Sequence, residues 1–153
     1  MTQQRTELLS IDPGLMTGLA AVDVADRKNP KLLWTKEKNV EQFHEFIEDY
    51  MRSKKDTLAV VMEDFIITQR TAGLSQQPWS LRLIGVVHFL AWKYDIPVFM
   101  HKPADKKFAE DNKKLQKIGF WHVGGAGHAN DSCRHAIKWI VDREPAFAKA
   151  FLT

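Results

Sequence analysis

The chain has 153 residues, of which 44% are hydrophobic and 27% are charged; this composition is typical of one globular domain, expected over residues 1–153, and excludes a low-complexity chain. Its apolar runs fall short of the roughly 20 residues of a membrane span and its polar start is unlike a signal peptide, so we expect a cytoplasmic protein with no membrane partner. The net charge of +3 slightly favours a polyanionic partner, and the lone Cys133 excludes an internal disulfide.

Apolar periodicity predicts five strands and four helices. The predicted strands cover residues 7–12, 17–24, 31–35, 57–62 and 96–100, and the predicted helices cover 40–51, 75 or 78 to 94, 102–117 and 128–142. Turn residues at 13–14 and 26–30 join the first three strands closely, so these form an antiparallel meander. The sequence therefore predicts an α/β fold: a mixed five-stranded sheet, made of a three-stranded antiparallel meander plus parallel strands, with helices on both faces.

The predicted helix that ends at Tyr94 is apolar on nearly every side, which requires burial on every side. One face can pack on the sheet and the other on a second copy of the chain, which predicts a homodimer. A helix enclosed within its own domain is the alternative. The polar, turn-rich residues 66–77 are expected to form a mobile loop before this helix.

Acidic residues stand where two predicted strands end and where the last helix begins. Asp12 ends the first strand, Glu63 follows the fourth, and Asp131 lies in the first turn of the last helix. In a sheet where these strands are neighbours, the carboxylates gather at one end and repel one another unless a cation lies among them. Carboxylate oxygens suit Mg2+ or Mn2+, and two such ions about 4 Å apart would clamp a phosphodiester. The alternative for Asp12 is a carboxylate that only starts a turn.

Histidines on the last predicted helix share a face with Asp131. His128 precedes Asp131 by three residues, so it could ligate a metal or orient an attacking water. A helix N-cap or a solvent-exposed histidine is the alternative for His128. His135, one further turn along, is expected to be structural.

Lysines fall within a narrow arc of the predicted helix 102–117. They are Lys102, Lys106, Lys113 and Lys117. Such an arc would track a sugar–phosphate backbone, and a solvated helix face is the alternative.

The acidic residues belong to an ordered set of motifs. The set consists of Ile11-Asp12-Pro13-Gly14 with Thr17-Gly18, then Met62-Glu63, then His128-Ala129-Asn130-Asp131. With these motifs the chain resembles the RuvC family of Holliday junction resolvases, from about residue 8 to residue 140. The resemblance implies an RNase H-like fold and a catalytic site with two Mg2+ ions, which Mn2+ is expected to replace. It implies that Asp12 bridges both ions, and that Glu63 and Asp131 each bind one. His128 falls where family members carry a fourth carboxylate or a histidine.

The resemblance also implies residues that contact DNA. Lys107, or its neighbour Lys106, falls on a family lysine that contacts phosphate near the cleavage site. Phe65 and Ile66 straddle the position of an aromatic wedge that enters the junction. The compact length resembles that of resolvases carried by bacteriophages, which also act on flaps and forks, and would place the protein in the host cytoplasm.

The sequence therefore predicts a homodimeric, metal-dependent endonuclease that resolves Holliday junctions and related branched DNA. Water attacks the phosphodiester in line and leaves 5′-phosphate and 3′-hydroxyl ends. One alternative is a flap or fork nuclease with little preference for four-way junctions, and another is a non-catalytic nucleic-acid-binding protein of the same fold. The segment 12–18 also resembles the phosphate loop of actin-like kinases, but those enzymes need two such domains to enclose a nucleotide.

Overall fold

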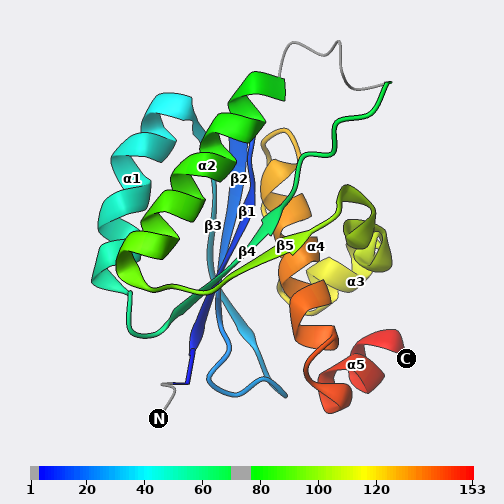
Figure 1. Cartoon of the computed structure of the whole chain (residues 1–153). Coiled ribbons are helices and arrows are strands. Elements are labelled where there is room, and N and C mark those ends of the chain that lie inside the picture. The colour runs from blue at the N-terminus through cyan, green and yellow to red at the C-terminus, as the bar shows by residue number, and fades with distance from the viewer. Residues whose placement is uncertain (1–3, 70–76) are drawn as a thin grey trace.

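Five strands form one mixed sheet in the computed structural model, which describes residues 4–69 and 77–153 (Figure 1). The elements in chain order are β1 (Glu7–Asp12), β2 (Met16–Asp23), β3 (Lys31–Asn39), α1 (Val40–Ser53), β4 (Leu58–Glu63), α2 (Gln77–Tyr94), β5 (Val98–His101), the 3-10 helix η1 (Pro103–Ala109), α3 (Asn112–Lys117), α4 (His128–Val141) and α5 (Pro145–Leu152). The strand order is β3-β2-β1-β4-β5. The predicted mixed sheet is confirmed.

Strand direction decides which strand ends meet. β1 pairs antiparallel with β2, and β2 pairs antiparallel with β3, as a meander requires. β1 pairs parallel with β4, and β4 pairs parallel with β5. The carboxyl ends of β1, β4 and β5 therefore lie at one end of the sheet, which is the upper end in Figure 1. The first turn of α4 lies at the same end.

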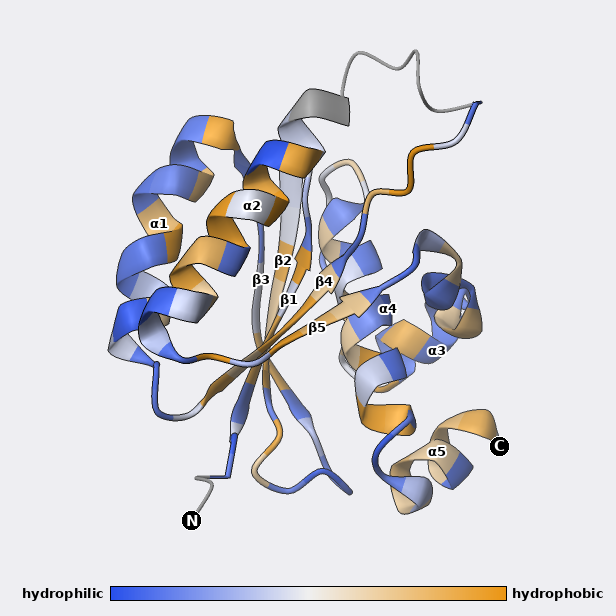
Figure 2. Cartoon of the chain, viewed as in Figure 1, coloured by the Kyte–Doolittle hydropathy of each residue, from blue (hydrophilic) through white to orange (hydrophobic). Residues whose placement is uncertain are grey.

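Helices cover both faces of the sheet. α1 and α2 pack on one face, while α4 packs on the other, with η1 and α3 beside it (Figure 1). The alternation of side chains along a strand divides β1 between the two cores: Leu9 faces α1 and α2, and Leu8 faces α4. Both leucines are fully buried, and each contributes about 1.5–3 kcal/mol by leaving water. The buried runs of β1 and β4 accordingly include hydrophobic colours in Figure 2, whereas the edge strand β3 is largely hydrophilic.

Two predicted elements differ from the structure, and one observed helix was not predicted. The predicted helix 102–117 is wrong: it is two short helices, because Asp111 begins a new helix by accepting a hydrogen bond from the backbone N–H of Lys113. β3 continues to Asn39, four residues beyond its predicted end. α5 was not predicted, although Glu144 caps it and Pro145 occupies its first turn. Most of the predicted loop 66–77 lies outside the described residues.

α2 was expected to pack on the sheet with one face and on a second copy of the chain with the other, or else to be enclosed within its own domain. Trp92 is 78% exposed, and Phe89 and Leu81 are also exposed, although neighbouring α2 residues belong to the core. This single chain therefore does not enclose the helix. No helix in the described part of the chain is long and apolar enough to cross a membrane.

Candidate active site

Asp12 and Glu63 end two neighbouring parallel strands. The last paired residues of β1 and β4 are Ile11 and Met62, so Asp12 and Glu63 follow at the same level of the sheet. Both continue the strand positions that face α4, because Leu8 and Val61 of those positions lie in the α4 core. The predicted meeting of the two carboxylates at one end of the sheet is confirmed.

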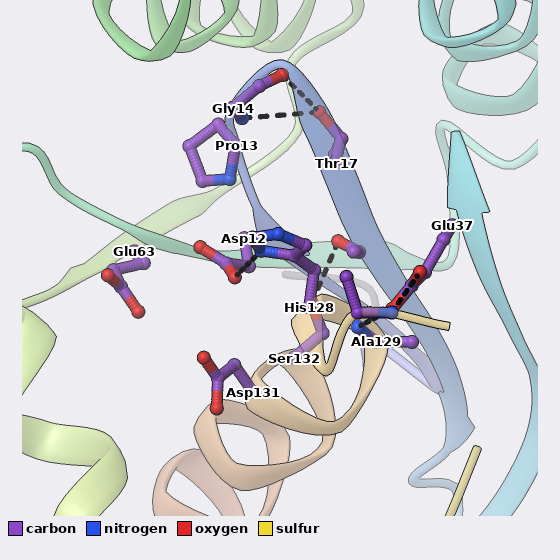
Figure 3. Close-up of polar contacts among 12 residues, drawn as sticks. Asp12, Pro13, Gly14, Thr17, Glu37, Glu63, His128, Ala129, Asp131 and Ser132 are labelled. Carbon is purple, nitrogen blue, oxygen red and sulfur yellow. Dashed lines mark hydrogen bonds and ion pairs between the residues drawn. The ribbon is translucent and has the colours of Figure 1, made fainter. Parts of the chain in front are cut away.

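The start of α4 is held close against β2. A Cβ atom on Gly18 would lie only 2.0 Å from the carbonyl oxygen of His128, so no larger residue fits there without displacing the helix. One turn further along α4, the Ser132 hydroxyl donates to the carbonyl oxygen of Gly18 over 2.7 Å (Figure 3). Gly18 is also the β2 partner of Asp12. These contacts place the first turn of α4 over the end of β1.

Glu37 of β3 binds the backbone at the beginning of α4. Its carboxylate accepts hydrogen bonds from the N–H of Ala126 at 3.0 Å and from that of Ala129 at 3.3 Å (Figure 3). Burial raises the pKa of Glu37, but the two backbone N–H groups together with the nearby His128 and His122 lower it by more, so its pKa lies below the ordinary value. Glu37 was not among the predicted site residues, because its strand was expected to end at residue 35, before it.

Asp12 is paired with His128. The Asp12 carboxylate is buried, and its Oδ2 lies 3.2 Å from Nδ1 of His128 (Figure 3). Burial raises the pKa of Asp12, and the negative charges of Glu63 and Asp131 raise it further against the opposing His128 hydrogen bond. The same hydrogen bond raises the pKa of His128. His128 is not the N-cap of α4, which is Gly127 with φ of 93°.

Lys106 lies between the other two carboxylates. Its Nζ is 3.1 Å from Oδ2 of Asp131 and 3.5 Å from Oε2 of Glu63. Burial lowers the pKa of Lys106, but the two carboxylates outweigh that effect and raise it. Asp131 also accepts a hydrogen bond from Arg134 at 2.9 Å. In this structure, therefore, the ammonium group of Lys106 occupies the acidic end of the sheet.

The donor set suits a hard divalent cation. Asp12, Glu63 and Asp131 offer carboxylate oxygens, which Mg2+ and Mn2+ prefer. Burial is the main cause of the raised pKa of Asp12, and the repulsion from the other two carboxylates, which adds to it, is what a bound cation relieves. As the side chains lie here, no three acidic, histidine or cysteine residues in the described ranges form a group that could hold a metal. Binding would require the side chains to turn and Lys106 to withdraw.

The other residues predicted to contact DNA lie on η1, on α3 and just beyond β4. Lys102 lies at the start of η1, Lys107 lies on η1 and Lys113 lies on α3, and all three are exposed. The arc predicted for Lys102, Lys106, Lys113 and Lys117 assumed one continuous helix, which the structure divides. Phe65, two residues beyond Glu63, is half-buried against the core under α1 and α2. Their binding of DNA remains a prediction.

Two histidines that sequence reasoning left without a functional role complete the surroundings of Glu63. His135 Nε2 lies 2.7 Å from Oε2 of Glu63, and His135 Nδ1 lies 3.1 Å from Nδ1 of His101. Burial, together with the neighbouring His135, lowers the pKa of His101 to about 4. His135 shares a helix face with His128, seven residues earlier, and this spacing was the one signal available.

No protein-family model and no curated protein matches the sequence. Solved structures match most of the chain. RuvC of Thermus thermophilus in complex with a Holliday junction substrate has a TM-score of 0.64 at 18% identity, covering 95% of this chain and 96% of that one. A second T. thermophilus RuvC structure has a TM-score of 0.65 at 17% identity, covering 94% and 96%. The fowlpox virus Holliday junction resolvase has a TM-score of 0.57 at 11% identity, covering 89% and 99%. The chain therefore has the RuvC-like resolvase fold of RNase H-like proteins.

Proposed function

We propose that this chain is a metal-dependent endonuclease that resolves four-way DNA junctions and related branched DNA. One observation carries the proposal: carboxylates from β1, β4 and α4 meet at one end of a sheet with the RuvC-like fold. One of the matching structures is a complex with a Holliday junction substrate, and another is named as a Holliday junction resolvase. The DNA backbone is a polyanion, which agrees with the net positive charge of the chain.

Asp12, Glu63 and Asp131 would hold the Mg2+ ions. Ions bound there supply positive charge that stabilises the attacking and leaving oxygens of the phosphodiester. Asp12 is the central ligand in this proposal, because the charges of both other carboxylates act on it. The resemblance of the motifs to those of RuvC supports the same assignment.

His128 and Lys106 have separate roles beside the three carboxylates. Nδ1 of His128 hydrogen-bonds Asp12 and so fixes the direction of that carboxylate. Lys106 neutralises Glu63 and Asp131 in the free protein. When a cation takes its place there, the ammonium group of Lys106 would be free to bind a DNA phosphate. Lys102, Lys107, Lys113 and Phe65 are proposed to contact the branched DNA around the site.

A homodimer is proposed to bring two such sites to one junction, with α2 as the contact. Phe89 and Trp92 on α2 expose large apolar surfaces next to each other, with ring centroids 6.1 Å apart. An exposed apolar patch of this kind favours association, and a helix that contacts its own copy gives a twofold axis. Two symmetric sites would cut the two strands of a four-way junction that are related by symmetry.

The test is cleavage of four labelled substrates with shared sequences: a four-way junction, a fork, a flap and a plain duplex, each with Mg2+. We expect the junction to be cut fastest, at paired positions on opposite strands. Faster cutting of flaps or forks would support the replication-branch nuclease instead. Binding of branched DNA without cleavage of any substrate, in Mg2+ or Mn2+, would support the non-catalytic alternative.

A further inference from the structure

His101 and His135 form a buried histidine pair behind Glu63. His101 ends β5, and His135 lies on α4, 34 residues later. The exposed fraction is 8% for His101 and 0% for His135. Both rings are therefore withdrawn from solvent, at the same end of the sheet as the acidic residues.

The sheet register explains why the pair meets Glu63. Glu63 and His101 are paired residues of the parallel strands β4 and β5, so both side chains leave the sheet on the α4 face. His135 reaches across them from the helix above. Its ring lies 5.3 Å from the His101 ring between centroids, and its Nε2 lies 2.7 Å from Glu63. The three side chains form one continuous line of hydrogen bonds.

These hydrogen bonds determine which ring nitrogens of His101 and His135 carry protons. The Glu63 carboxylate can only accept, so Nε2 of His135 carries a proton and donates it. A neutral His135 then has an acceptor at Nδ1, and Nδ1 of His101 must donate to it. Burial and the neighbouring ring hold the pKa of His101 near 4, which agrees with a neutral His101.

We propose that the buried histidine pair positions Glu63 for metal binding: His135 holds one carboxylate oxygen, and His101 fixes the tautomer of His135. Lys106 and His135 both contact Oε2 of Glu63, so Oε1 is the oxygen that the pair presents to a cation. Partners that orient a metal ligand in this way typically account for 10–100-fold in metal affinity or activity. The inference rests on the proposed function, because it assigns Glu63 as a metal ligand.

The first test reads the tautomers directly in the wild-type protein. Histidine 15N shifts and their couplings to ring protons show which nitrogen carries hydrogen. We expect His135 to carry its proton on Nε2 and His101 on Nδ1, at neutral pH and without metal. His135 protonated on Nδ1 alone would overturn the inference, because that tautomer cannot donate to Glu63.

The second test compares H135L with H135Q, using Mn2+ as the probe. H135L keeps an apolar side chain but removes the donor, whereas the amide of H135Q restores an N–H. We expect Mn2+ binding to the DNA-free protein to weaken by about 10–100-fold in H135L and to recover in part in H135Q. Junction binding should stay unchanged in both. Cys133→Ala is the matched control, because Cys133 is equally buried on α4 but faces the hydrophobic core.

The outcomes separate the two proposals. Wild-type protein that binds Mn2+ and cleaves, with a folded H135L that binds Mn2+ equally well, overturns the positioning role alone. Wild-type protein that neither binds Mn2+ nor cleaves overturns the proposed function and the positioning role with it. If H135L does not fold, the tautomers of the wild-type protein and the Mn2+ affinity of H101F decide. A wild-type Mn2+ affinity in H101F would show that His101 does not act on Glu63 through His135.

Discussion

Gly18→Ala tests whether the close packing of α4 on β2 builds the site. Gly18 faces the backbone at the start of α4, and an added Cβ would lie 2.0 Å from the carbonyl oxygen of His128 and 2.6 Å from the N–H nitrogen of Ala129. Ordinary van der Waals contact for a Cβ begins at about 3.4 Å. The first turn of α4 must therefore retreat by about 1.4 Å, and it carries His128 and Asp131 with it.

The magnitude follows from this displacement. Overpacking of this kind lowers the free energy of unfolding by about 1–3 kcal/mol. For a chain of about 150 residues, each 1 kcal/mol lowers the Tm by about 2–4 °C. We therefore expect the Tm of Gly18→Ala to fall by about 2–12 °C. A shift of about 1 Å in a catalytic group costs about 100-fold in rate, so junction cleavage should fall by at least that factor.

The assay combines thermal unfolding with the initial rate of junction cleavage below the lower Tm. Gly85→Ala is the matched control, because a Cβ there meets nothing within 4 Å and lies on an exposed position of α2. Its Tm should stay level or rise, since alanine is the better helix former. Gly18→Ala with the wild-type Tm and cleavage rate would refute the reasoning, because α4 would then tolerate the added atom.

Three further predictions concern charge, pH and assembly. K106M removes the ammonium group beside Glu63 and Asp131, so it should lower the metal-free Tm and enlarge the rise in Tm on adding Mg2+. K107M removes an exposed ammonium group and should do neither. Equal rises in Tm in the two variants would show that Lys106 does not substitute for a cation. The pKa of His101 falls from 6.5 to about 4 on folding, so the unfolded chain binds the proton more tightly, and stability in urea should decline by about 3 kcal/mol from pH 6.5 to 4. H101F should lose that part of the decline, and an unchanged decline would contradict it. In analytical ultracentrifugation the wild type should sediment as a dimer and W92E as a monomer with an unaltered fold. A monomeric wild type would contradict the α2 contact.

Buried strands were the most predictable part of the fold. β1 and β4 are short apolar runs that end in an acidic residue, and both ends fell within one residue of the prediction. Parallel pairing of these strands then fixed where Asp12 and Glu63 meet. The edge strand β3 was underestimated, because its last residues, Lys36 to Asn39, are polar and carry no apolar alternation.

Helix interruptions were harder to predict than strands. Most residues of 102–117 are good helix formers, and the break falls at Asp111, whose carboxylate accepts a capping hydrogen bond from the N–H of Lys113. The break has a consequence for function, because Lys106 faces Glu63 and Asp131 rather than joining an exposed arc of lysines. α5 had a readable signal in Pro145 and in the buried phenylalanines at 147 and 151.

The immediate ligands of the candidate site could be predicted, but not the residues that support them. Asp12, Glu63 and Asp131 stand at element ends, where sequence position implies location. His101 contacts His135 only because β5 pairs with β4 and α4 crosses that pair. Glu37 reaches α4 from a strand more than 85 residues earlier. Such contacts depend on tertiary register, which local periodicity does not contain.

Asp12→Asn tests the central claim most directly. The amide oxygen of asparagine can keep the hydrogen bond with His128, so the fold should be preserved while a charged ligand is lost. Wild type and variant are compared in binding and in single-turnover cleavage of the same four-way junction with Mg2+. The account predicts paired cleavage by the wild type, and unchanged junction affinity without cleavage by Asp12→Asn. Cleavage by Asp12→Asn at the wild-type rate would contradict it, because the carboxylate at the end of β1 would then not be needed for the reaction.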